Sequence, residues 1–96
     1  SLAPQMETVL ETGMETLRKR LLYKATHRGM QETDKLIGGF AEQELGNLSE
    51  ELLHAFDLLT DVPDADLLNW ILGREAIPEA YDNEIMGLII KFKESL

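Results

Sequence analysis

The chain has 96 residues, of which 44% are hydrophobic and 28% charged, and its formal net charge at pH 7 is −9. This length and composition predict one globular domain, and the acidic balance argues against a nucleic-acid binder, which usually carries net positive charge. Cysteine is absent, which excludes disulfides, cysteine-based metal sites and a thiol nucleophile.

The N-terminal part of the chain has two regions of different character. Residues 1–12 contain Pro4 and have irregular apolar spacing, which predicts a flexible tail before a helical domain over residues 13–96. A first helix is predicted from about Gly13, because apolar residues recur there at three- and four-residue steps. Its inward stripe consists of Leu17, Leu21, Leu22 and Ala25.

A second helix is predicted over about residues 30–45. Its inward stripe consists of Thr33, Leu36, Ile37 and Phe40. The Gly38-Gly39 pair lowers the helix propensity by about 2 kcal/mol relative to two alanines. We therefore expect a close helix crossing there, with a kink as the less common alternative.

A third helix is expected after Asn47 or Ser49, either of which can cap its start. Its apolar positions are Leu48, Leu52, Leu53, Phe56 and Leu59. His54 lies alone among them and is expected at the surface. Residues 61–66 then predict a loop, in which Pro63 and three aspartates signal the start of the next helix. These aspartates lack the spacing of a calcium-binding loop, so no metal site is expected.

Two further helices complete the predicted fold. A fourth, over about residues 64–73, should bury Leu67, Leu68, Ile71 and Trp70 and end at Gly73. A last helix, over about residues 79–94, has an inward stripe of Tyr81, Ile85, Leu88, Ile89 and Phe92, and its late lysines Lys91 and Lys93 suit its negative end. No segment alternates as a half-buried strand would. We predict an all-α fold, a compact single-domain bundle of about five helices.

Residues 27–34 separate a basic run from the acidic remainder of the chain. Residues 16–31 contain no Asp or Glu, but they hold five of the nine Lys and Arg residues, namely Arg18, Lys19, Arg20, Lys24 and Arg28. We expect these residues to give the first helix an exposed positive face that orients the protein toward an anionic partner surface. The alternative is a charged face that is merely solvated.

Gly29 has two possible explanations within this stretch. It can end the first helix in a left-handed conformation, with Glu32 in the first turn of the next helix. It can instead allow the backbone of a partner to come close. Arg28 and Glu32 are four residues apart and would share a face if both were helical, although a base before an acid is the weaker order.

Two signatures in this chain resemble those of the succinate dehydrogenase assembly factor family. The first is His27-Arg28-Gly29-Met30-x-Glu32-x-Asp34, preceded by Arg18-Lys19-Arg20-Leu21-Leu22-Tyr23, in which Arg28, Gly29 and Glu32 fill the family hallmark R-G-x-x-E. The second is Leu58-Leu59-x-Asp61-x-Pro63-Asp64-x-Asp66-Leu67-x-Asn69-Trp70, an acidic loop leading into a helix that ends in Asn-Trp. The resemblance covers residues 16–92. This loop has one extra residue relative to a plain D-P-D-L.

The resemblance implies a factor that binds the flavoprotein subunit of succinate dehydrogenase, with fumarate reductase as a second candidate client, and promotes covalent attachment of FAD to it. The FAD would belong to the client, and the factor would bind no cofactor stably. We expect a monomer when the factor is free. The implied partner-binding residues are Arg28, Gly29, Glu32, His27, Met30, Asp34, Arg20, Arg18 and Lys24.

We expect no catalytic residue in this chain. His27 and His54 lack a Ser-His-Asp context, and the glycine-rich signatures of phosphate and flavin binding are missing. Our hypothesis is that Arg28 and Glu32 make charge-assisted hydrogen bonds to the client, while Gly29 permits close approach. A Gly29→Arg substitution should then abolish activity without unfolding the protein. The alternative function is an antitoxin-like regulatory module that binds another protein.

The sequence also makes a prediction about location. No apolar run approaches the roughly 18–20 residues that span a bilayer, so we expect no membrane insertion. No secretory signal is visible, and neither is an Arg- and Ser-rich presequence poor in acidic residues. A bacterial cytoplasm is therefore expected rather than a mitochondrial matrix.

Overall fold

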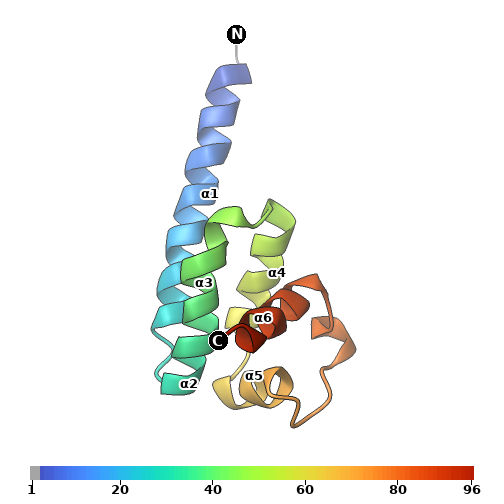
Figure 1. The fold of residues 1–96 in the computed structure, drawn as a ribbon. Coiled ribbons are helices and arrows are strands. Elements are labelled where there is room, and N and C mark those ends of the chain that lie inside the picture. Colours follow the sequence, from blue (N-terminus) through green and yellow to red (C-terminus); the bar gives the residue numbers. More distant parts are fainter. Residues whose placement is uncertain (1–2) are drawn as a thin grey trace.

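Residues 3–96 fold into five successive helical segments, which we call rods (Figure 1). The computed structural model describes the backbone of residues 3–96 and the side chains of residues 13–96. Within that range there is no β-strand, so the predicted all-α, single-domain fold is confirmed. No helix in the described range is long and apolar enough to cross a membrane.

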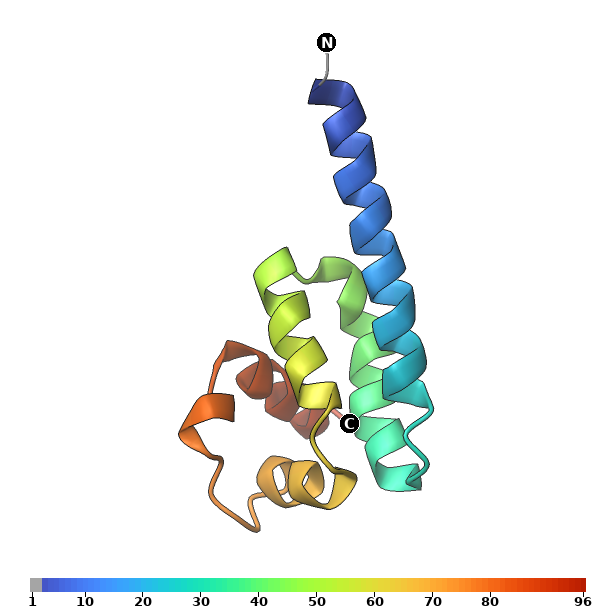
Figure 2. The ribbon, with the colours of Figure 1, turned by 180° about the vertical axis from the view of Figure 1, so that it is seen from behind.

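The first rod, α1 (Ala3–Thr26), is the longest helix and extends well beyond the others at its N-terminal end (Figures 1 and 2). The molecule is therefore elongated, with principal extents of 54, 26 and 24 Å. The predicted helix start near Gly13 is wrong, because the backbone is already helical from Ala3. Of the predicted tail over residues 1–12, the first two residues lie outside the described range, and the flexibility of the tail stays a prediction.

The second rod runs antiparallel to α1 and lies beside its C-terminal half (Figures 1 and 2). It is continuous from residue 31 to residue 47, but its helix type changes three times, from α to π, back to α and then to 3₁₀. Its parts are α2 (Gln31–Thr33), the π-helical turn η1 (Asp34–Gly38), α3 (Gly39–Glu44) and the 3₁₀ turn η2 (Leu45–Asn47). The predicted inward stripe is confirmed, because Thr33, Leu36, Ile37 and Phe40 are all buried.

The two adjacent glycines in this rod allow close packing on both of its sides. A Cβ atom added to Gly38 would lie 3.1 Å from the carbonyl oxygen of Ala25 in α1. One added to Gly39 would lie 3.2 Å from the ring of Phe92. Because glycine lacks a Cβ, the rod can approach both neighbours more closely than alanine would allow. The expectation of a close helix crossing at this pair is confirmed.

The third and fourth rods are α4 (Glu50–Thr60) and α5 (Asp64–Ile71). Ser49 caps α4 by accepting a hydrogen bond from the backbone nitrogen of Leu52 at 3.3 Å, which decides between the two predicted caps. Two residues after α5, Gly73 has a φ of +74°, a left-handed conformation that suits glycine and stops the helix near its predicted end.

The last rod starts later than the sequence suggested. Residues 79–81 form a separate 3₁₀ turn, η3 (Glu79–Tyr81), and α6 (Glu84–Glu94) begins only after Asn83. The Asn83 side chain accepts a hydrogen bond from the backbone nitrogen of Met86 at 3.2 Å, so it is the cap that sets the start of this helix. The predicted start near residue 79 is wrong because this cap was overlooked.

One hydrophobic core joins all five rods, and α6 packs against α4, α5 and η1 to close it. Its largest fully buried apolar side chains are Phe40, Phe56, Leu21, Ile37, Leu53, Leu59, Leu67, Ile71, Ile85, Met86 and Ile89. Trp70 is buried as predicted and stacks on Tyr81, with ring centroids 5.2 Å apart. Leu22 was predicted to face inward, but it is exposed.

Candidate functional site

The residues of the R-G-x-x-E motif lie where α1 turns into α2. We call residues 27–30 the motif turn. Gly29 in this turn is exposed and has a φ of +97°, a conformation that residues with a side chain rarely adopt. Glu32 lies in the first turn of α2. The structure therefore supports the helix-end explanation of Gly29. Arg28 lies in the turn and not on a helix, so the condition under which it would share a helix face with Glu32 is not met.

Asp34 closes the motif turn from the other side. Its carboxylate accepts a hydrogen bond from the backbone nitrogen of Arg28 at 2.8 Å. Its own backbone nitrogen donates to the carbonyl oxygen of Met30 at 2.9 Å. Asp34 thus ties both ends of the turn together, and it is half-buried in doing so.

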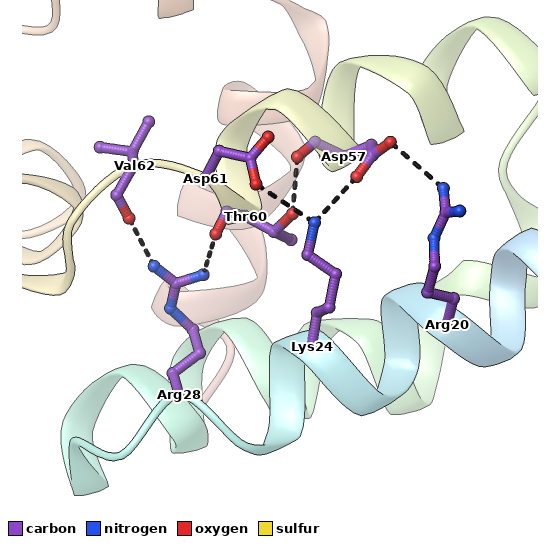
Figure 3. A network of polar contacts seen from close by, with 7 residues as sticks. All are labelled: Arg20, Lys24, Arg28, Asp57, Thr60, Asp61 and Val62. Carbon is purple, nitrogen blue, oxygen red and sulfur yellow. Dashed lines mark hydrogen bonds and ion pairs between the residues drawn. The ribbon is translucent and has the colours of Figure 1, made fainter.

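The side chain of Arg28 reaches away from the motif turn into the junction of α4 and α5 (Figure 3). We call residues 60–64 the acidic corner. There Nη1 donates to the carbonyl oxygen of Thr60 at 2.7 Å, Nη2 to that of Val62 at 2.5 Å, and Nε to the Asp64 carboxylate at 2.5 Å. The side chain is only 8% exposed. The guanidinium thus supplies donors to the carbonyl of Thr60, which the end of α4 leaves unpaired within the helix, and to that of Val62 in the loop that follows.

Two other basic residues, both in α1, pair with acidic residues of α4 and of the acidic corner (Figure 3). Lys24 Nζ donates to Asp57 at 3.1 Å and to Asp61 at 3.2 Å. Arg20, one turn earlier, lies 3.6 Å from the Asp57 carboxylate and is 62% exposed. Burial alone would lower the pKa of Lys24, but the hydrogen bonds and negative charges of Asp57 and Asp61 raise it above 10.5.

Arg18 is also engaged within the protein. Its Nε donates to the carbonyl oxygen of Leu45 at 3.0 Å and its Nη2 to that of Leu48 at 2.9 Å, at the end of the second rod. The expected exposed positive face is therefore wrong for Arg18, Lys24 and Arg28. Their partners lie 27 to 37 residues away in the sequence, so the basic run alone could not reveal them.

The acidic loop was interpreted as a set of helix-start signals, and this is only partly correct. Asp64 and Asp66 do lie in the first turn of α5, but Pro63 occupies the capping position and no side chain caps the helix. Asp61 instead binds Lys24 of α1, and Asp64 binds Arg28 of the motif turn. The described residues contain no group of three or more His, Asp or Glu side chains that could hold a metal ion.

What remains exposed around the motif turn is an aromatic and apolar surface beside one carboxylate. Tyr23 is 65% exposed and stacks on His27, with ring centroids 4.1 Å apart, and Met30 is 37% exposed. Glu32 is exposed, and within residues 13–96 its carboxylate has no hydrogen-bond or ion-pair partner. Next to this surface lies a shallow depression of about 310 Å³, lined by Tyr23, Lys24, His27, Arg28 and Thr60.

The predicted site residues thus separate into two groups. Arg18, Lys24, Arg28 and Asp34 make contacts inside the protein, whereas His27, Gly29, Met30 and Glu32 are exposed. Arg20 belongs to both groups, because it pairs with Asp57 but is largely exposed. The sequence reasoning left out Tyr23 and the acidic partners at positions 57, 61 and 64. One signal was available: Arg20, Lys24 and Arg28 follow one another at four-residue steps, and such a stripe can face acidic residues on a second helix. Partner binding by any of these residues stays a prediction.

Comparisons with known proteins cover most of this chain. A family model described as "Flavinator of succinate dehydrogenase" matches residues 19–93, which include the motif turn and the acidic corner. The mitochondrial succinate dehydrogenase assembly factor 2 of Dictyostelium discoideum is 42% identical over 76 residues, which are 79% of this chain and 54% of that protein. The FAD assembly factor SdhE of Acetobacter pasteurianus is 39% identical over 71 residues, 74% of this chain and 65% of that protein.

A third relative, the mitochondrial succinate dehydrogenase assembly factor 2 of Danio rerio, is 36% identical over 84 residues, 85% of this chain and 53% of that protein. The chain therefore spans between about half and two thirds of the length of these three relatives. The matched range carries both signatures in one all-helical domain. This chain belongs to the family of succinate dehydrogenase flavinators.

Proposed function

We propose that this protein binds the flavoprotein subunit of succinate dehydrogenase and promotes the covalent attachment of FAD to that subunit. The observation that carries the proposal is the family match over residues 19–93. The factor is a monomer when free and is not itself an enzyme. The client supplies both the flavin and the histidine that becomes bonded to it, and the factor retains no cofactor.

The contact surface in this proposal is the exposed side of the motif turn. Aromatic residues and methionine are enriched at interfaces, and Tyr23, His27 and Met30 provide such a surface here. The unpaired Glu32 carboxylate beside them can accept charge-assisted hydrogen bonds from a cationic group of the client. Binding there would hold the flavin domain of the client in a geometry that favours attack by its own histidine on the flavin.

Covalent flavin fluorescence of the flavoprotein subunit on a denaturing gel tests this function. The comparison uses cells that lack the protein and cells supplied with wild type, Glu32→Ala or Glu42→Ala. Glu42 is a matched control, because it is also an exposed carboxylate on the second rod but lies in α3, away from the motif turn. Wild type and Glu42→Ala should restore the fluorescence, and Glu32→Ala should not.

Equal fluorescence in every lane would refute the proposed function. The antitoxin-like alternative would then predict an effect on growth or on the activity of a target, without any change in covalent flavin. Recovery with Glu32→Ala at the wild-type level would keep the function but refute the assigned contact surface.

Two narrower proposals concern the second client and the compartment. We retain fumarate reductase as a second candidate client and the bacterial cytoplasm as the location. The relatives named above include two mitochondrial proteins and one from a bacterium, so family membership is compatible with either compartment. Flavinylation assays with the purified flavoprotein of each enzyme test the second client directly.

A further inference from the structure

We propose that Arg28 is a positioning residue, whose guanidinium locks the motif turn onto the acidic corner and does not touch the client. The inference rests on the proposed function and assigns a role to one residue of the hallmark motif. Gly29, Met30 and Glu32 would then be the residues of the motif region that meet the client, in a shape that Arg28 holds fixed.

The first argument is that the hydrogen-bonding capacity of Arg28 is already used inside the protein. Nε and both terminal nitrogens donate to three different acceptors in the acidic corner. The Asp64 side chain that receives one of them is only 17% exposed. Turning the guanidinium toward a client would leave two carbonyl oxygens and this carboxylate without their partner, and such losses are costly in a poorly solvated place.

The second argument is that Arg28 is fixed at its backbone as well as at its side chain. The backbone nitrogen is held by Asp34, which also binds the carbonyl oxygen of Met30. The side chain of Arg28 therefore links the motif turn to the acidic corner, which lies 32 to 36 residues later in the sequence. Loss of the side-chain contacts would detach the turn from that corner and let Met30 and Glu32 shift.

The third argument concerns the type of residue. The three acceptors lie around one planar guanidinium, and each faces a different nitrogen. A lysine has the same charge but only one nitrogen at the end of a flexible chain, so it cannot reproduce this fork of donors. A residue that served only as a positive charge for a client could be replaced by lysine, whereas this positioning role could not.

The decisive variant is Asp64→Asn, because it disturbs the partner of Arg28 and leaves Arg28 itself in place. Asp66→Asn is the matched control, since Asp66 lies in the same first turn of α5 but is exposed. The dissociation constant with purified flavoprotein subunit is measured by calorimetry, well below the melting temperature of each variant. Asp64→Asn removes the negative charge that strengthens the bond from Nε, and Arg28→Lys removes the fork of donors, so each should weaken binding by about tenfold or more. Asp66→Asn should bind like wild type.

A second measurement distinguishes positioning from a general loss of structure. Amide hydrogen exchange should accelerate over residues 29–32 in Asp64→Asn, while the buried amides of α6 keep their protection. At saturating concentrations of the variant, the maximal rate of flavinylation should return to that of wild type, because the contacts in the formed complex are the same. If exchange increases throughout the protein, the effect is global unfolding and the positioning role is refuted.

The outcomes separate this inference from the function on which it rests. Failure of the wild type to bind the flavoprotein subunit would refute the proposed function itself. Wild-type binding together with unchanged binding by Asp64→Asn would refute the positioning role alone, because the Asp64 contact would then not support client binding. Tighter binding by Asp64→Asn would also refute it, because a guanidinium released from Asp64 would then be the group that the client contacts.

Discussion

Replacement of Gly29 by alanine separates backbone strain from crowding at the motif turn. A Cβ at this position would meet no atom within 4 Å, so the substitution causes no clash in the free protein. The φ of +97° is nevertheless unfavourable for alanine and costs about 1–3 kcal/mol. Alanine also makes the unfolded chain less flexible than glycine does, which offsets about 0.4–1 kcal/mol of this cost. We expect a net loss of about 0–2.6 kcal/mol in the free energy of unfolding, and its central value of about 1.3 kcal/mol corresponds to roughly 5–10 °C in melting temperature for a domain of this size.

Thermal unfolding followed by circular dichroism measures this loss, and Gly87→Ala is the control. Gly87 also has open space around its missing Cβ, but it lies inside α6 without a positive φ. Alanine there should raise the free energy of unfolding by about 0.5–1 kcal/mol. If both variants are stabilised, the strain argument at Gly29 is wrong. Gly29→Arg should lose about as much stability as Gly29→Ala and remain folded, but its bulk at the contact surface should abolish client binding.

Three further predictions concern the packing and charges that support the site. Gly38→Ala should lower the free energy of unfolding by about 1–2 kcal/mol in urea titrations, because its Cβ would press against α1; a midpoint raised as much as that of Gly87→Ala would show that the rods can separate at no cost. Phe56→Ala, at a fully buried position, should cost about 3–5 kcal/mol by the same method, and a loss below 1 kcal/mol would contradict its place in the core. Since folding raises the pKa of Lys24 above 10.5, its contribution is complete below that pH and is lost as the pH rises through the folded value. The stability difference between wild type and Lys24→Met, measured from pH 8 to pH 11.5, should therefore shrink only at the alkaline end, and a difference that is constant over this range would refute the ion-pair argument.

Local patterns in the sequence were sufficient for the helices and much of the core. The second rod shows why, because the spacing of Thr33, Leu36, Ile37 and Phe40 is set by one helix and is visible without knowledge of its neighbours. The close approach at Gly38 was also predictable, because two glycines inside a helix need a compensating reason. The capping side chain of Asn83 is an equally local signal, but the last helix was predicted to start near residue 79 instead.

The charged residues of the site could not be assigned in the same way. Whether Lys24 faces solvent, a partner or another helix depends on which acidic residues the fold brings opposite it, and these come from α4 and the acidic corner. A run of basic residues therefore predicts that their charges will be paired with acidic groups. It does not predict whether those groups belong to the same protein or to a partner. For Gly29 the sequence left two explanations open, and the positive φ supports one of them.

The link between Arg28 and the acidic corner also affects the order in which the protein can form during synthesis. The acceptors of the guanidinium lie at residues 60, 62 and 64, so its set of partners is incomplete until the chain has been made at least through the start of α5. A nascent chain that ends earlier can form the helix of α1 but not the anchored turn that follows it. A client that recognises the anchored turn would then bind only factor molecules whose synthesis and folding are complete. Only a factor folded through both halves of the domain could present the anchored turn.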